Sequence, residues 1–88
     1  MKQLENEFIG RGQVKGFIFT QIKKSEFAYI YKVDIGDCLH YEVFKHKENK
    51  YYDCVSYPSD KSFGLWAWTY KDLDSAFSKF ESLEVNNG

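Results

Sequence analysis

Hydrophobic and polar residues alternate along most of the first 69 residues, in stretches separated by short polar or glycine-containing turns. Alternation of this kind, rich in aromatic and β-branched residues, is typical of β-strands. We predict five strands, at 14–22, 27–33, 38–45, 51–57 and 63–69. The turn at 23–26 is rich in charge, and the turn at 34–37 contains a glycine, so both favour hairpins.

The period of the hydrophobic pattern changes after residue 69. One apolar stripe then recurs at helical spacing and consists of Leu73, Ala76, Phe77, Phe80 and Leu83. Thr69 and Asp72 have the spacing of a capping box, with Asp in place of the preferred Glu or Gln. The pattern therefore predicts a helix over 70–84.

These elements define an α+β fold, in which an antiparallel meander of four to five strands packs on one C-terminal helix. A length of 88 residues corresponds to a single domain. We expect an irregular N-terminal segment at 1–12, the sheet at 13–69 and the helix at 70–84.

The strands carry more aromatic residues than one helix can cover, since the chain has two Trp, seven Tyr and eight Phe. If the first three turns are two-residue loops, one sheet face is almost wholly apolar and suits the helix stripe. That face is predicted to hold Phe17, Phe19, Ala28, Ile30, Leu39, Tyr41, Val43, Tyr52 and Cys54. The opposite face is aromatic with polar groups, although a single β-bulge would exchange part of the two sets.

The aromatic face is the main functional lead, because it needs a fold-back of the chain, a second subunit or a ligand to cover it. Its candidate binding residues are Phe27, Tyr29, Tyr31, His40 and Tyr57. Dimerisation or a protein partner would bury this aromatic area. We therefore expect a non-catalytic binding module that acts by protein–protein interaction or self-association.

A basic end of the sheet supports a different function. Lysines from two turns and from the end of the third strand are predicted to gather there, namely Lys23, Lys24, Lys45, Lys47 and Lys50. They are candidates for anion or phosphate binding, together with the helix N-terminus if it emerges at the same end. With aromatic stacking, they make single-stranded nucleic-acid binding the alternative function. A net charge of −1 gives no broad electrostatic support for it, and solubilising hairpin tips would look the same.

His40 and Glu42 project from one face of the same predicted strand, with tyrosines beside them. This set suffices for general acid–base chemistry, for example in a small phosphodiester-acting enzyme. It is equally what a solvated strand face contains, and the sequence offers no activated nucleophile. An enzyme is therefore the third alternative.

Cysteine and glycine spacing predicts no cofactor or metal site. Cys38 and Cys54 diverge in the predicted register, so we expect two reduced, buried or half-buried thiols. Gly10, Gly12 and Gly16 precede a strand, whereas a phosphate loop needs a strand before it and a helix after it. The sequence shows neither a signal-peptide core nor an apolar run of about 20 residues, which predicts a cytoplasmic location without membrane association.

Several segments carry a resemblance to other proteins. They are residues 7–17, 28–33, 40–44 and 62–80, which include Glu7-Phe8-Ile9-Gly10 and His40-Tyr41-Glu42-Val43-Phe44. Together they resemble short uncharacterised proteins of gut Bacteroidetes and of their phages and mobile elements. The resemblance implies an accessory or mobile-element role and supplies no functional residues.

Overall fold

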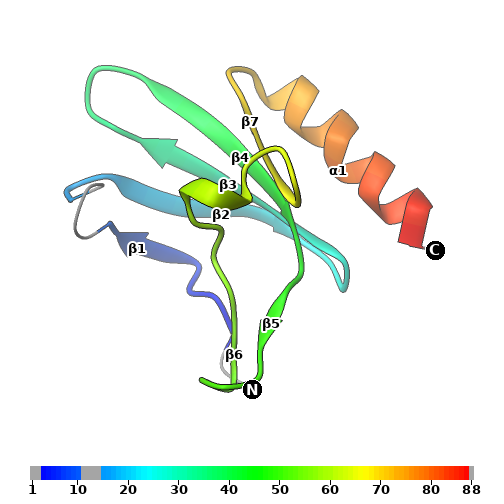
Figure 1. The fold of residues 1–88 in the computed structure, drawn as a ribbon. Coiled ribbons are helices and arrows are strands. Elements are labelled where there is room, and N and C mark those ends of the chain that lie inside the picture. The colour runs from blue at the N-terminus through cyan, green and yellow to red at the C-terminus, as the bar shows by residue number, and fades with distance from the viewer. Residues whose placement is uncertain (1–2, 11–14, 88) are drawn as a thin grey trace.

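A computed structural model describes residues 3–10 and 15–87 and has the predicted α+β architecture (Figure 1). An antiparallel five-stranded sheet has the order β1-β2-β3-β4-β7, and helix α1 packs on one of its faces. The bounds are Glu7–Ile9 for β1, Ile18–Lys24 for β2, Ala28–Asp34 for β3, Leu39–Lys45 for β4, Ala67–Tyr70 for β7 and Leu73–Asn87 for α1. The predicted loop residue Gly12 lies outside the described residues.

The segment predicted as the fourth strand leaves the sheet. Glu48–Asn49 (β5) and Cys54–Val55 (β6) form a separate two-stranded ribbon, seen at the bottom of Figure 1, and a short 3-10 helix at Asp60–Ser62 precedes β7. The side-chain Oδ1 of Asn49 accepts the backbone N–H groups of Tyr51 and Tyr52, which turns the chain where a strand was expected. The predicted strand at 51–57 is therefore wrong, and β7 takes its place beside β4.

The N-terminal segment is not wholly irregular, because β1 pairs antiparallel with β2 and forms one edge of the sheet. Phe8 lies opposite Phe19, and their rings stack with centroids 4.7 Å apart. The sheet therefore begins at Glu7, within the segment that was expected to precede it.

A β-bulge in β2 exchanges the faces of that strand. Phe19 lies opposite Val33, but beyond the irregularity between Gln21 and Lys23 it is Lys23 that lies opposite Ile30. Phe19 consequently shares a face with Tyr31 and not with the helix, contrary to the prediction. Strands β3 and β4 kept their predicted faces, because the shift between them is an even number of residues. Tyr52 and Cys54, predicted on the helix face, lie outside the five-stranded sheet.

The helix covers one face through the predicted stripe. Its buried core consists of Ala28, Ile30, Val43, Ala76, Phe80 and Leu83. The helix begins three residues later than predicted, and Asp72 caps it by accepting the backbone N–H of Ser75 at 2.9 Å. This hydrogen bond lowers the pKa of Asp72. Thr69 still belongs to β7, so the predicted capping box does not form.

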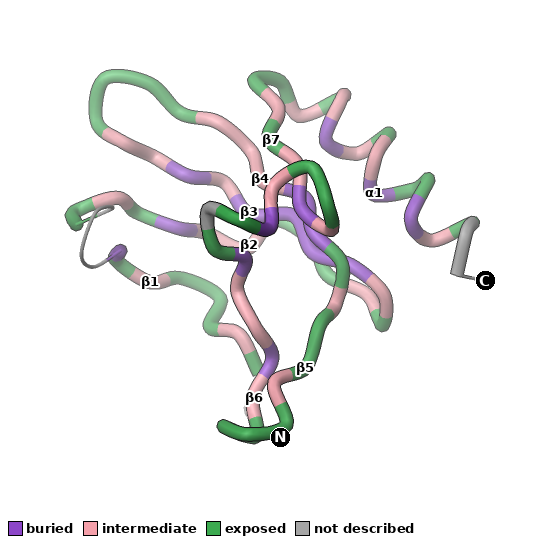
Figure 2. The backbone as a smooth tube through the Cα atoms, in the orientation of Figure 1, coloured by how far each residue is buried: buried purple, intermediate pink, exposed green. Residues whose placement is uncertain are grey.

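The aromatic face is covered by the same chain, so the expectation that it lies open is wrong. Its buried residues are Phe19, Tyr29, Tyr31, Val33, Phe44, Val55 and Ala67. Leu4 and Phe8 cover it from the N-terminal segment, while Tyr57, Phe63 and Trp66 cover it from the connection between β6 and β7. Figure 2 shows the result as buried positions along the central strands and exposed positions at the hairpin tips.

Within residues 3–10 and 15–87, no helix is both long enough and apolar enough to cross a membrane.

Candidate functional site at the β1 edge

Two of the five predicted binding residues are inaccessible. Tyr29 is 2% exposed and Tyr31 is 0% exposed. The Tyr31 hydroxyl donates to the carbonyl oxygen of Glu5 at 2.6 Å and accepts from Nε2 of Gln21 at 2.9 Å. The Tyr29 hydroxyl lies 3.2 Å from Nδ1 of His46. Because both hydroxyls have partners and both rings are buried, these two tyrosines belong to the core.

The remaining predicted residues are half-buried, and Tyr57 is central among them. Its ring packs edge-on against Phe8, Phe19 and Tyr31 at centroid distances of 5.4–5.5 Å. Its hydroxyl donates to Oε1 of Glu42. Tyr57 therefore joins the covering segment to the sheet by both packing and a charge-assisted hydrogen bond.

Glu42 links Tyr57 to His40. The second carboxylate oxygen, Oε2, lies 3.2 Å from Nε2 of His40, which confirms that these two side chains share a strand face. Burial and the nearby Glu42 carboxylate raise the pKa of Tyr57, so its hydroxyl keeps the proton and is a poor general base. Both oxygens of Glu42 have protein partners, which is the arrangement of a structural network.

The five lysines do not form one anion site. Lys23 Nζ lies over the rings of Phe77 and Phe80 on the helix side, whereas Lys47 Nζ lies over Trp66 on the other side. Lys24, Lys45 and Lys50 are exposed.

The helix N-terminus lies at the opposite end of the sheet from these lysines. Strand β7 runs antiparallel to β4 and finishes with Tyr70 opposite Tyr41, whereas Lys45 ends β4 near Ala67. The predicted contribution of the helix N-terminus to an anion site is therefore wrong, because β7 and not residues 51–57 lies next to β4.

The two cysteines are free, and Cys38 is exposed in the turn before β4, contrary to the expectation of a covered thiol. Cys54 is half-buried. Across the part of the chain that the structure describes, no three His, Cys, Asp or Glu residues cluster as a metal site would require.

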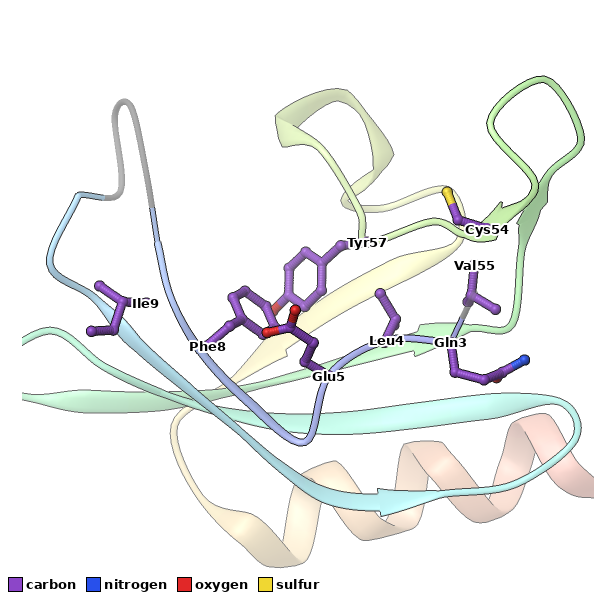
Figure 3. A pocket seen from close by; sticks show the side chains of 8 residues that line it. All are labelled: Gln3, Leu4, Glu5, Phe8, Ile9, Cys54, Val55 and Tyr57. Carbon is purple, nitrogen blue, oxygen red and sulfur yellow. The ribbon is translucent and has the colours of Figure 1, made fainter. Parts of the chain in front are cut away.

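A groove lies on the covered aromatic side, between the N-terminal segment and β6 (Figure 3). It encloses about 370 Å³ and is lined by Gln3, Leu4, Glu5, Phe8, Ile9, Cys54, Val55 and Tyr57. Figure 3 shows helix α1 on the far side of the sheet, so the groove is separate from the helix core. The lining is mainly apolar, and one wall belongs to an edge strand.

Among residues 3–10 and 15–87, no strand pairs with the outer edge of β1, which lies beside this groove. The hydrogen bonds from Gln21 N–H to the Asn6 carbonyl and from Gly10 N–H to the Phe17 carbonyl identify the even-numbered positions of β1 as those that bond to β2. In an antiparallel pair the intervening residues direct their N–H and C=O groups outward. Glu7 and Ile9 therefore present their backbone groups away from the sheet, and the Ile9 side chain is 66% exposed.

The β6 segment has a similar outward position. Ser56 N–H donates to the Lys47 carbonyl, which makes Val55, opposite Glu48, a non-hydrogen-bonded position of the ribbon. Val55 therefore directs its backbone N–H and C=O away from β5.

Sequence reasoning missed the site formed by the β1 edge and the groove, because β1 is too short for its alternation to be recognised.

An exposed aromatic pair lies at the tip of the ribbon. Tyr51 and Tyr52 are 87% and 72% exposed, and their rings make an edge-to-face contact at 4.8 Å. Asp53 beside them has a φ of 52°, in the left-handed region that is uncommon for residues other than glycine. The rings of Tyr51 and Tyr52 are therefore accessible to a partner.

Comparisons with protein-family models, with curated proteins and with solved structures find no match. The resemblance to short proteins of gut Bacteroidetes and their mobile elements therefore stays a prediction.

The burial of Tyr29, Tyr31 and Tyr57 predicts cooperative unfolding in alkali. Burial raises the pKa of each hydroxyl above the value of about 10 in an unfolded chain. The neutral hydroxyls therefore contribute stability that is fully present below about pH 10 and is lost as the pH rises further. Tyrosinate absorbance and far-ultraviolet circular dichroism, followed together during an alkaline titration, are expected to show these three groups ionising as the fold is lost.

In the variant Tyr57→Phe, one tyrosine fewer is expected to ionise during the alkaline unfolding transition. Ionisation of Tyr29, Tyr31 and Tyr57 in a chain that keeps its native circular dichroism would show that the aromatic face is not covered as described.

Proposed function

We propose that this chain is a non-catalytic protein-binding module whose docking surface is the β1 edge and the adjoining groove. The outward backbone groups of Glu7 and Ile9 carry the proposal. An extended peptide segment that pairs with them would add a strand to the sheet, while its side chains enter the groove. The proposed docking surface is therefore not the aromatic face, which the chain itself covers, but the β1 edge next to it.

Because β1 is short, backbone hydrogen bonds contribute only a small part of the binding free energy. With three residues in the strand, an added segment gains few backbone hydrogen bonds, each worth about 0.5–1.5 kcal/mol net. Apolar contact with Leu4, Phe8 and Val55 therefore supplies most of the affinity, at about 25 cal/mol per Å² of buried apolar surface before the costs of association. Backbone pairing chiefly selects an extended conformation.

A second copy of the chain is one candidate partner, since two β1 edges can pair about a twofold axis. Glu7 weighs against this pairing. With the axis at Glu7 the two carboxylates lie directly opposite, and with the axis at Phe8 they are diagonal neighbours. Only a register centred on Ile9 separates them, so a different protein fits the edge better.

The His40–Glu42–Tyr57 network is, in our proposal, structural and not catalytic. The tyrosine keeps its proton, and the carboxylate is engaged on both oxygens. The exposed, unpaired thiol of Cys38 favours a reducing compartment, so the cytoplasm stays our proposed location.

Replacement of Ile9 by proline provides a direct test of strand addition. The Ile9 N–H does not bond to β2, so Ile9→Pro removes an outward donor and leaves the pairing of β1 with β2 in place. The matched control Ile9→Ala truncates the same side chain but keeps the N–H. Peptides selected on the wild-type protein from a displayed library of random linear peptides are expected to bind Ile9→Pro at least about tenfold more weakly than Ile9→Ala.

Circular dichroism of both variants checks that the fold persists. Equal binding of the selected peptides to Ile9→Pro and Ile9→Ala, or a library that yields no binder, would refute docking at this edge.

Single-stranded nucleic-acid binding is a second candidate function, favoured by the exposed ribbon tip. Tyr51 and Tyr52 offer accessible rings close in sequence to Lys47 and Lys50. Base stacking on such rings is worth about 1–3 kcal/mol per base. Tyr29 and Tyr31, which the sequence suggested for this role, are buried and take no part in it.

A labelled oligothymidylate at low salt tests this candidate. Binding that weakens steeply with added salt and disappears in the double variant Tyr51→Ala, Tyr52→Ala is the expected result if the tip binds nucleic acid. The absence of binding at low salt would eliminate the function.

A further inference from the structure

Two acidic side chains, those of Glu5 and Glu7, lie at the described part of the β1 edge. Of the described residues that line the groove, Glu5 alone is charged, and its carboxylate is drawn there in Figure 3. Glu7 is an exposed residue of β1 itself. Neither carboxylate is engaged in a side-chain ion pair in the described structure, where the ion pairs formed are those of His40 with Glu42 and His46 with Glu48. The docking edge thus offers two free negative charges.

The two sides of an added strand meet different surroundings. Successive side chains of a strand point to opposite faces of a sheet. Those on the side of Phe8 enter the groove with Leu4 and Val55, which is apolar. Those on the other side lie beside Glu7, where an opposite charge directly across the strand pair is favourable.

We propose that the segment bound at the β1 edge alternates apolar and basic side chains. The apolar side chains fill the groove, and a lysine or arginine pairs with Glu7, while Glu5 favours further positive charge at the groove. The inference rests on the proposed function and gives its ligand a chemistry. A second copy of β1 lacks that chemistry, since its residues Glu7, Phe8 and Ile9 include no basic side chain.

Three capped synthetic peptides of equal length serve as probes, alternating valine with lysine, with threonine or with glutamate. Exposed charge pairs contribute modestly, so the valine–lysine peptide is expected to bind about threefold to tenfold more tightly than the valine–threonine peptide. The valine–glutamate peptide is expected to bind most weakly. Added salt should narrow these differences, because it screens exposed charges.

Charge reversal at the edge provides the decisive comparison. In the double variant Glu5→Lys, Glu7→Lys the order of the lysine and glutamate peptides is expected to invert. The matched control Glu26→Lys, Glu81→Lys makes the same change in net charge at two exposed positions, in the turn after β2 and on the helix, and is expected to keep the wild-type order.

The possible failures are distinguishable. Equal binding of the three peptides to the wild type, or inversion in the control variant as well, would overturn the acidic-edge inference and leave strand addition standing. Retention of the lysine peptide by Ile9→Pro with undiminished affinity would show general charge attraction and overturn the inference at this site. Failure of all three peptides, together with an unproductive library, would instead refute the proposed function.

Discussion

A sheet with bulky apolar side chains on both faces has to be covered twice, and the described residues form only one long helix. The second cover comes from two irregular segments, residues 3–8 and 54–66, which pack on the aromatic face. Tyr57 anchors the second of them, since its ring contacts the aromatic cluster and its hydroxyl bonds to Glu42. Full burial of one large apolar side chain stabilises the fold by about 1.5–3 kcal/mol. Exposure of a whole face of such side chains would therefore remove a large part of the folding free energy of a domain of this size.

The second cover also determines the sheet topology. Residues 54–65 lie across the aromatic side and make no pairing with β4, and β7 occupies that position instead. The N-terminal segment reaches the same face only by joining the sheet through β1. The outcome is an edge strand whose inner side pairs with β2 and whose outer side pairs with no other described strand, next to the groove left between the two covering segments.

The predictable parts of this fold are those with sustained periodicity. The helix stripe through Phe80 and Leu83 and the facing strand residues Ile30 and Val43 follow from spacing alone. The bulge near Ile22 could not be predicted in this way. It leaves no signature in the residue types and only moves the strand pairing by one position. The absence of 51–57 from the sheet had one local signal, Asn49, whose side chain accepts hydrogen bonds from two backbone N–H groups. The aromatic residues of 51–57 nevertheless favoured the prediction of a strand.

The candidate site could not be derived from sequence for a related reason. Tyr31 and Tyr57 look like surface aromatics until the segments that cover them are placed, and that placement depends on long-range packing. The shared face of His40 and Glu42 was predictable from their spacing, whereas the bond from Tyr57 to Glu42 was not. The three residues of β1 carry too little pattern to reveal an edge strand.

Residue-specific amide hydrogen exchange provides the strongest test of how β1 is paired. If β1 pairs inward with β2 and leaves its outer edge free, the Phe8 amide is protected while the amides of Glu7 and Ile9 exchange rapidly. Protection of Glu7 and Ile9 would show that the outer edge of β1 is covered, and rapid exchange of Phe8 together with its neighbours would show that β1 does not pair with β2.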